Sequence, residues 1–327
     1  MRGSKARIWV LASVMVLAAG VTCAQTKKPA QVDPNKFAVI INGPGGEAVY
    51  AKQFDEWTGQ LSSVLSGRYG FDEKKITVLS EKSATAEGVK GVFGALKSQL
   101  EADNVLFLFF IGHGSFDGKE SKFNLTGPDI SATEYNTLLS SLPTRRVVVF
   151  NMSSASGEFI KSLAAKGRIV VTATRNGQET NATRFTGFLI SALQATDADT
   201  DQDGHTSVLE AFVYANRLTA DFYKRAGRLA SEHALFDDSG DGVGHEKIEA
   251  GEGLLARATY LDSLSVDEAA ATAATGRLLK ERTRLEGEIE QLIARKGNMP
   301  ETEYEASLER LFIELAKVNR SIKQAGS

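Results

Sequence analysis

Short runs of β-branched and aromatic residues alternate with longer amphipathic stretches, and this alternation constrains the fold more than any other feature of the chain. We expect buried strands at residues 37–43, 75–80, 105–111, 146–151 and 168–174. We expect helices between and after them, at residues 51–69, 84–100, 131–142, 157–166 and 186–195. Strands that alternate with helices form a mostly parallel sheet covered on both faces. The sequence therefore predicts a three-layer α/β/α fold.

Size and composition are those of an ordinary globular protein. The chain has 327 residues, of which 42% are hydrophobic and 24% charged. A net charge of -3 gives no reason to expect nucleic acid as the main partner. We therefore expect one large domain, at residues 37–262.

The first residues have the composition of an export signal. Three basic residues precede an apolar run at residues 8–21, and small residues follow it at 22–24. The run is shorter than the roughly 20 residues that a membrane-spanning helix needs. We expect a signal peptide at residues 1–24, cleavage before Gln25, and an exported protein, periplasmic or secreted, with no membrane span. The alternative is a lipoprotein anchored at Cys23.

Residues 25–36 are polar and contain two prolines, which indicates a flexible linker between the signal peptide and the domain. Cys23 is the only cysteine of the chain. If cleavage occurs before Gln25, the mature protein has neither a disulfide nor a thiol nucleophile.

The last segment, residues 263–327, has a different pattern. Apolar residues recur at helical or heptad spacing on both sides of a break at residues 297–300. They are Leu278, Leu285, Ile289 and Leu292 before the break, and Tyr304, Leu308, Leu311, Leu315, Val318 and Ile322 after it. We expect an antiparallel helical hairpin. It would pack on itself or on the domain, or else serve as a coiled coil for a partner or for self-association.

Two strand ends carry the residues that could perform chemistry. The run 105–111 leads into Gly112, His113 and Gly114, and the run 146–151 leads into a serine-rich segment. Consecutive strands of a parallel sheet usually lie side by side, so His113 should lie near those serines. An imidazole beside a hydroxyl is a minimal nucleophile–base pair. The plainer alternative is a turn with a solvated histidine and a serine-rich loop.

In these two blocks the chain resembles the caspase/legumain superfamily (clan CD cysteine peptidases), most closely its bacterial legumain-like members. The resemblance spans roughly residues 37–261 and implies a caspase-hemoglobinase-like fold. It implies His113 as general base, Ser154 at the position of the nucleophile, and the amides of Gly114 and Ser154 as oxyanion donors. It also implies cysteine-type endopeptidase activity in the family.

The departure from the family is that Ser154 replaces the nucleophilic cysteine. A thiol with a pKa near 8.5 is readily ionised by an imidazole, whereas a serine needs an acid that orients the histidine. The acidic residue nearest in sequence that could orient His113 is Asp117. Ser153 is the alternative candidate for the nucleophile. We expect a non-catalytic pseudopeptidase that binds a peptide or protein partner. The alternatives are an active endopeptidase or serine hydrolase with a Ser154–His113 dyad, and a calcium-dependent structural protein.

Residues 199–210 have the spacing of an EF-hand calcium loop. Aspartates occupy positions 1, 3 and 5, glycine occupies position 6, and glutamate occupies position 12. Carboxylates so close together repel one another unless a cation lies between them, so we expect structural Ca²⁺. The alternative is a solvated acidic loop without a metal. The predicted ligands are Asp199, Asp201, Asp203, the His205 main chain, Ser207 through a water, and Glu210.

Two further glycine-rich segments carry weaker signals. Residues 237–242 begin like a second calcium loop, but Ile248 stands where the glutamate should be, so an ordinary turn is at least as good an interpretation. Residues 43–46 follow the first strand without the lysine of a phosphate-binding loop, and we interpret them as a tight turn.

Overall fold

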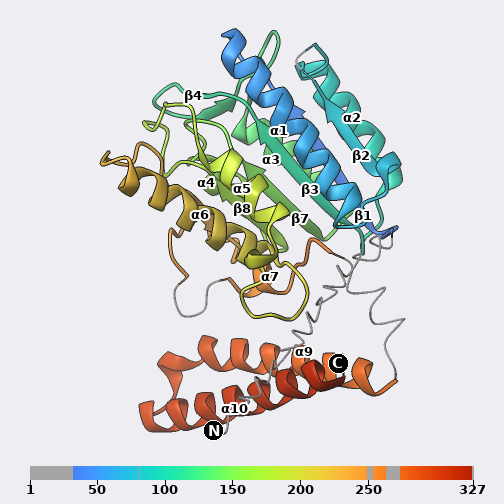
Figure 1. The fold of residues 1–327 in the computed structure, drawn as a ribbon, viewed down its shortest axis with the longest axis vertical. Coiled ribbons are helices and arrows are strands. Elements are labelled where there is room, and N and C mark those ends of the chain that lie inside the picture. Colours follow the sequence, from blue (N-terminus) through green and yellow to red (C-terminus); the bar gives the residue numbers. More distant parts are fainter. Residues whose placement is uncertain (1–31, 81, 249–252, 263–272, 326–327) are drawn as a thin grey trace, which may run out of the picture.

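The computed structural model describes residues 32–80, 82–248, 253–262 and 273–325. A six-stranded sheet forms the centre of the domain, in the order β2-β1-β3-β7-β8-β9 (Figure 1). Its first five strands are parallel, and β9 is antiparallel to β8. The strands are β1 (Lys36–Asn42), β2 (Ile76–Leu79), β3 (Val105–Ile111), β7 (Arg146–Asn151), β8 (Arg168–Thr172) and β9 (Leu235–Asp237).

Helices cover both faces of this sheet because its central strands are apolar on both sides. In β3, Phe107 and Phe109 point into one core and Leu108 and Phe110 into the other. One core is covered by α1 (Ala48–Gly67), α5 (Phe185–Gln194) and α6 (Val208–Arg225), and the other by α2 (Ala86–Gln99), α3 (Ala132–Ser140) and α4 (Phe159–Leu163). This arrangement confirms the predicted three-layer, mostly parallel α/β fold.

Polar side chains fix the starts of several helices. Ser131 and Glu134 form a reciprocal capping box at α3, and Ser207 and Glu210 form another at α6. The buried Glu232 accepts hydrogen bonds from the amides of Arg184 and Phe185 at the start of α5. A carboxylate at a helix N-terminus pairs with amides that have no partner within the helix.

A small antiparallel sheet follows β3, and the sequence did not predict it. It consists of β4 (Gly114–Phe116), β5 (Ser121–Phe123) and β6 (Ile130–Ser131). These strands have two or three residues each, too few for a period-2 pattern to be visible. Since β4 begins at Gly114, this sheet fixes the backbone immediately after His113.

The C-terminal helices α9 (Ala273–Ala294) and α10 (Glu301–Ala325) pack on each other, joined through η3 (Lys296–Asn298), as the heptad pattern predicts (Figure 1). Leu285, Ile289 and Leu311 form their buried core, and Leu292, Leu308, Leu315 and Val318 pack against it. The predicted seam is therefore used within the hairpin. The side chain of Ile322 lies outside the described residues.

The N-terminal segment enters the fold before β1. The predicted signal peptide, Cys23 and residues 25–31 of the expected linker lie outside the described residues. The Asp33 amide already donates to Gly70, at 2.7 Å, and β1 begins at Lys36, one residue earlier than expected. Lys36 is buried, and its ammonium has partners there: it donates to the Leu261 carbonyl, at 2.5 Å, and lies 3.6 Å from Asp33. No helix among the described residues is long and apolar enough to cross a bilayer.

Candidate functional site

The ends of β3 and β7 place the predicted pair at one edge of the sheet. The two strands are parallel neighbours, and Phe110 pairs with Asn151. His113 and Ser154 each lie three residues after this pair. The chain segments do meet. The Gly114 amide donates to Ser154 Oγ, at 3.2 Å, and Ser154 Oγ donates to the Gly114 carbonyl, also at 3.2 Å.

The partners of the His113 ring come from α1 and from the turn after β1. Its edge-to-face partners are Tyr50 and Phe54 of α1, with ring centroids 5.2 and 5.1 Å away. Its Nε2 lies 3.3 Å from the Gly45 carbonyl. Among the described residues, the hydrogen bond of this ring therefore goes to the turn after β1 and not to Ser154. That turn needs glycine at position 45, because an added Cβ would lie 2.3 Å from the Ala51 nitrogen.

Ser154 is the better candidate of the two adjacent serines, although both are buried. The hydroxyl of Ser153 donates to Asn151 Oδ1, at 2.7 Å, and the Ser153 amide donates to the same oxygen. Ser153 therefore closes the end of β7, whereas the Ser154 hydroxyl contacts the backbone of Gly114, the residue after His113.

The residue after Ser154 has strained backbone geometry. Ala155 has φ of 51°, in the left-handed region that residues with a Cβ rarely adopt. Its amide donates to the Glu179 carbonyl, at 2.8 Å, and its own carbonyl accepts from Ser121 Oγ, at 2.7 Å. Such strain persists where the surroundings over-determine it, and it is concentrated at functional sites.

The loop after β8 supports the far side of the serine segment. The Thr174 hydroxyl lies 3.1 Å from Ser156 Oγ and accepts from the Gly157 amide, at 3.0 Å. A Cβ on Gly157 would lie 2.3 Å from the carbonyl carbon of Arg175. Position 157 requires glycine for this close approach of two backbones.

Asp117 does not orient His113. Its carboxylate accepts from the amides of Glu120 and Lys119 in the β4–β5 turn and lies 3.6 Å from the Lys122 ammonium. These backbone hydrogen bonds, together with Lys122, lower the pKa of Asp117. It is a turn residue, and the hydrogen-bonding partner of the His113 ring among the described residues is the uncharged carbonyl of Gly45.

Several residues of this site carried no sequence signal. Tyr50 and Phe54 belong to helix α1, whose apolar residues are explained by packing in the core and so gave no indication of a contact with His113. Glu179 lies in a loop, where its carboxylate contacts His233 Nδ1, at 2.5 Å, and accepts from the amides of Arg175 and His233. Glu179 and His233 are 54 residues apart, and a single sequence does not show such pairing.

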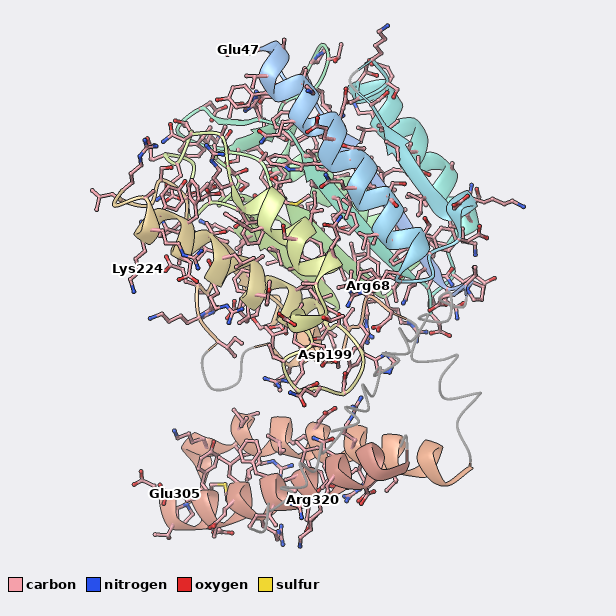
Figure 2. The ribbon with its side chains drawn as sticks, in the orientation of Figure 1. Glu47, Arg68, Asp199, Lys224, Glu305 and Arg320 are labelled. Atoms are coloured by element: carbon pink, nitrogen blue, oxygen red, sulfur yellow. The ribbon has the colours of Figure 1, made fainter. Side chains whose placement is uncertain are left out.

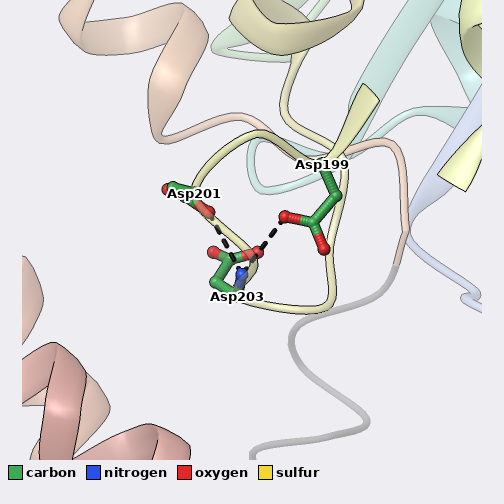
Figure 3. Close-up of side chains that lie close together, drawn as sticks. All are labelled: Asp199, Asp201 and Asp203. Atoms are coloured by element: carbon green, nitrogen blue, oxygen red, sulfur yellow. Dashed lines mark hydrogen bonds between the residues drawn. The ribbon is translucent and has the colours of Figure 1, made fainter. Parts of the chain in front are cut away.

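The acidic loop lies near the opposite, amino-terminal edge of the sheet (Figure 1). Carboxylate oxygens of Asp199, Asp201 and Asp203 lie within 4.8 Å of one another (Figure 3). The turn that gathers them has positive φ at Gln202 (58°) and Gly204 (91°). Three oxygens at this separation fit a hard cation.

The electrostatics of the loop also fit a cation. Partial burial, and then repulsion by the carboxylates of Asp203 and Glu210, raise the pKa of Asp201 to about 6. Burial raises the pKa of Asp199, with Asp203 and Glu210 again adding to the effect. Carboxyl groups with raised pKa values are stabilised in their charged form by a nearby positive charge.

The other predicted ligands have partners within the protein. Glu210 Oε1 accepts from the amides of Thr200 and Asp201, and Oε2 accepts from the amide and hydroxyl of Ser207. Coordination by Glu210 would exchange some of these bonds for metal contacts. The His205 ring lies 3.1 Å from the Asp262 carboxylate, so its imidazole already has a partner outside the loop.

Residues 237–242 form a turn and a helix cap. Asp237 accepts from the amides of Ser239, Gly240 and Gly242. Asp238 instead caps α7 (Leu254–Arg257), accepting from the amides of Gly253 and Ala256. The two buried carboxylates therefore serve different backbone segments, which agrees with the turn interpretation of this sequence.

No protein-family model and no curated protein matches the chain. A solved structure with some similarity is the crystal structure of protein GSU0716 from Geobacter sulfurreducens. It is 16% identical, with a TM-score of 0.43, over 57% of this chain and 89% of that one.

Proposed function

We propose that this protein is an exported, non-catalytic relative of the caspase/legumain peptidases, which binds a peptide or protein segment beside His113 and Ser154. One observation carries the proposal. The Ser154 hydroxyl is hydrogen-bonded to both the amide and the carbonyl of Gly114, while the His113 ring is bonded to Gly45. The Ser154 hydroxyl is not hydrogen-bonded to His113, the expected general base. It accepts instead from the Gly114 amide, the group that would otherwise stabilise an oxyanion.

The chemistry of serine supports the same conclusion. A serine hydroxyl is activated when a histidine accepts its proton and a buried acid orients that histidine, and loss of the acid lowers kcat by about 10⁴. The orienting group here is a carbonyl without charge. A thiol at position 154 would need less help, because its pKa is near 8.5.

The rival function is a serine hydrolase or endopeptidase that uses the Ser154–His113 dyad. A fluorophosphonate probe distinguishes the two, because it reacts with activated serines. We expect no labelling of the purified protein after hours of incubation, as judged by intact mass. Labelling of Ser154 that disappears in His113→Ala would establish the rival and overturn the proposal.

Restoring the thiol tests whether the site has the geometry of the family. We expect Ser154→Cys to react with iodoacetamide at least tenfold faster than Ser154→Cys combined with His113→Ala, since the imidazole favours the thiolate. Ser153→Cys is the matched control, because the adjacent Ser153 is bonded to Asn151. Equal rates with and without His113 would show that the two side chains do not act together.

We also propose that residues 199–210 bind one structural Ca²⁺ through Asp199, Asp201, Asp203, the His205 carbonyl, Ser207 and Glu210. The carboxylate cluster and its raised pKa values support this proposal. Titration calorimetry should give one site in the native protein and none in Asp201→Asn, which keeps the shape of the residue and removes its charge. Binding of equal affinity by the variant would contradict the assignment.

We further propose export, with mature protein beginning at Gln25 or, as the alternative, lipid attached to Cys23. The mass of protein recovered from a cell envelope fraction distinguishes these outcomes.

Self-association would use the outer surface of α10, where Phe312 and Ile313 are exposed. Light scattering on the native protein and on Phe312→Ser tests that surface.

A further inference from the structure

Arg282 connects the C-terminal hairpin to the acidic loop. Its guanidinium donates from Nη1 to Asp203 Oδ2, at 3.2 Å, and from Nη2 to the Tyr260 hydroxyl, at 3.1 Å. The Tyr260 hydroxyl in turn donates to Asp203 Oδ2, at 3.2 Å. The three side chains therefore form a closed triangle between α9, the chain segment before it, and the loop.

This contact is buried. The side chains of Arg282 and Asp203 are only 9% and 11% exposed. Solvent screens a pair of this kind much less than it screens a surface ion pair. Arg282 also lies 3.8 Å from Glu286 of its own helix. Arg284, two residues further along α9, pairs with Glu281 and Glu288 of the same helix and is about half exposed.

Arg282 balances part of the negative charge of the acidic loop. The loop gathers the carboxylates of Asp199, Asp201, Asp203 and Glu210. Among the ion pairs of the described residues, Arg282 is the basic side chain that reaches any of these four. The guanidinium of Arg282, which belongs to the hairpin, thus already supplies one positive charge to the loop.

The segment that leads to the hairpin is also bonded to the loop. Val208 donates its amide to the Thr259 carbonyl, at 2.8 Å, and Leu261 donates to the Thr206 carbonyl, at 2.9 Å. Asp262 accepts from the Thr206 amide, at 3.1 Å. Residues 206–208, in the last third of the loop, therefore form a short antiparallel pairing with residues 259–261. A change of loop geometry acts directly on the connection to α9.

We infer that Arg282 is a tethered counter-cation of the acidic loop, and that a divalent cation in the loop competes with the docking of the hairpin. The inference rests on the proposed cation site. A bound Ca²⁺ neutralises two of the four negative charges that attract Arg282, repels the guanidinium, and needs an oxygen of Asp203. Because such coupling is reciprocal, the docked hairpin weakens Ca²⁺ binding by the same factor by which Ca²⁺ weakens docking.

Calorimetry on the full chain tests the competition. We expect Arg282→Met, which keeps the apolar stem of the side chain, to bind Ca²⁺ at least about fivefold more tightly than the native protein. Arg284→Met, the matched control on the same helix, should bind with native affinity. Tyr260→Phe, which removes the bridging hydroxyl, should change affinity in the same direction as Arg282→Met and by less.

Distances between spin labels give a readout of docking that does not depend on calorimetry. Labels at Lys224→Cys on α6 and Arg320→Cys on α10 (Figure 2), with Cys23→Ser, report the position of the hairpin against the domain. Ca²⁺ should broaden the distance distribution of the native chain. Without Ca²⁺, Arg282→Met should show the broad distribution and Arg284→Met the narrow one.

The outcomes separate the inference from the cation site. Native or weaker Ca²⁺ affinity in Arg282→Met overturns the competition and leaves the site in place. Absence of Ca²⁺ binding in the native chain and in all variants overturns both. Binding by Arg282→Met alone supports the inference in its strongest form.

Discussion

Glycine 157 lies where a side chain has no room, and this makes it the sharpest residue-level test of the site. We expect Gly157→Ala to lower the free energy of unfolding by about 2 to 3 kcal/mol, because two backbone segments must separate. Gly94→Ala is the control, since an added Cβ at that exposed position in α2 meets nothing within 4 Å. Gly94→Ala should raise the free energy of unfolding by about 0.5 to 1 kcal/mol, measured by chemical unfolding. Similar effects at the two positions would contradict the packing around Ser156.

Lys36 gives a prediction with a defined pH window. Burial, partly offset by Asp33, lowers its pKa from 10.5 to about 8. Between these values the folded protein binds fewer protons than the unfolded chain, so the free energy of unfolding rises with pH. Relative to Lys36→Met, the native protein should gain on the order of 2 kcal/mol between pH 8 and pH 10.5. A difference that is constant over this range in urea unfolding would show that the ammonium is not buried.

The sequence predicts which residues meet at the site better than it predicts how they are oriented. His113 and Ser154 follow neighbouring parallel strands, so their proximity is a consequence of topology. The direction of the His113 ring depends instead on Tyr50, Phe54 and Gly45, whose positions arise from packing between separate segments. A single sequence contains no pattern for such contacts.

At the scale of elements, the hairpin offers two adjacent residues with opposite surroundings. Leu311 is 6% exposed in the core between α9 and α10, whereas Phe312 is 51% exposed. We expect Leu311→Ala to destabilise the hairpin by about 2 to 4 kcal/mol, seen as faster amide hydrogen exchange in both helices. Phe312→Ala should leave exchange nearly unchanged. If both variants exchanged equally fast, α10 would not pack through the predicted seam.

Long apolar elements are predicted well and short ones are not. The strands at 105–111 and 146–151 have the predicted bounds, because continuous apolar runs end at polar or glycine residues. The helix expected at 157–166 is only Phe159–Leu163, since the residues before it belong to the turn held by Thr174. The strand β9 and the helix α7 have three and four residues, and tertiary pairing creates both.

At the scale of the whole molecule, calcium should affect stability more than it affects the Ser154 site. Saturating Ca²⁺ at about 100 times its Kd adds about 2.7 kcal/mol, which corresponds to a Tm increase of roughly 5 to 10 °C. Asp201→Asn should lose this increase, and Mg²⁺ should give less of it. Thermal scans by circular dichroism after chelation provide the measurement. A Tm that Ca²⁺ does not change would contradict a structural role for the ion.

The ammonium of Lys36 donates to the Leu261 carbonyl at the edge of the sheet where the chain enters the domain. This contact joins the entry of the domain to the segment that leads into the hairpin, at the amino-terminal ends of the strands, whereas His113 and Ser154 follow the carboxyl-terminal ends of β3 and β7. A chain held at its N-terminus would therefore turn its hairpin toward the attachment point. The edge that carries His113 and Ser154 would project outward, where a diffusing ligand could reach it.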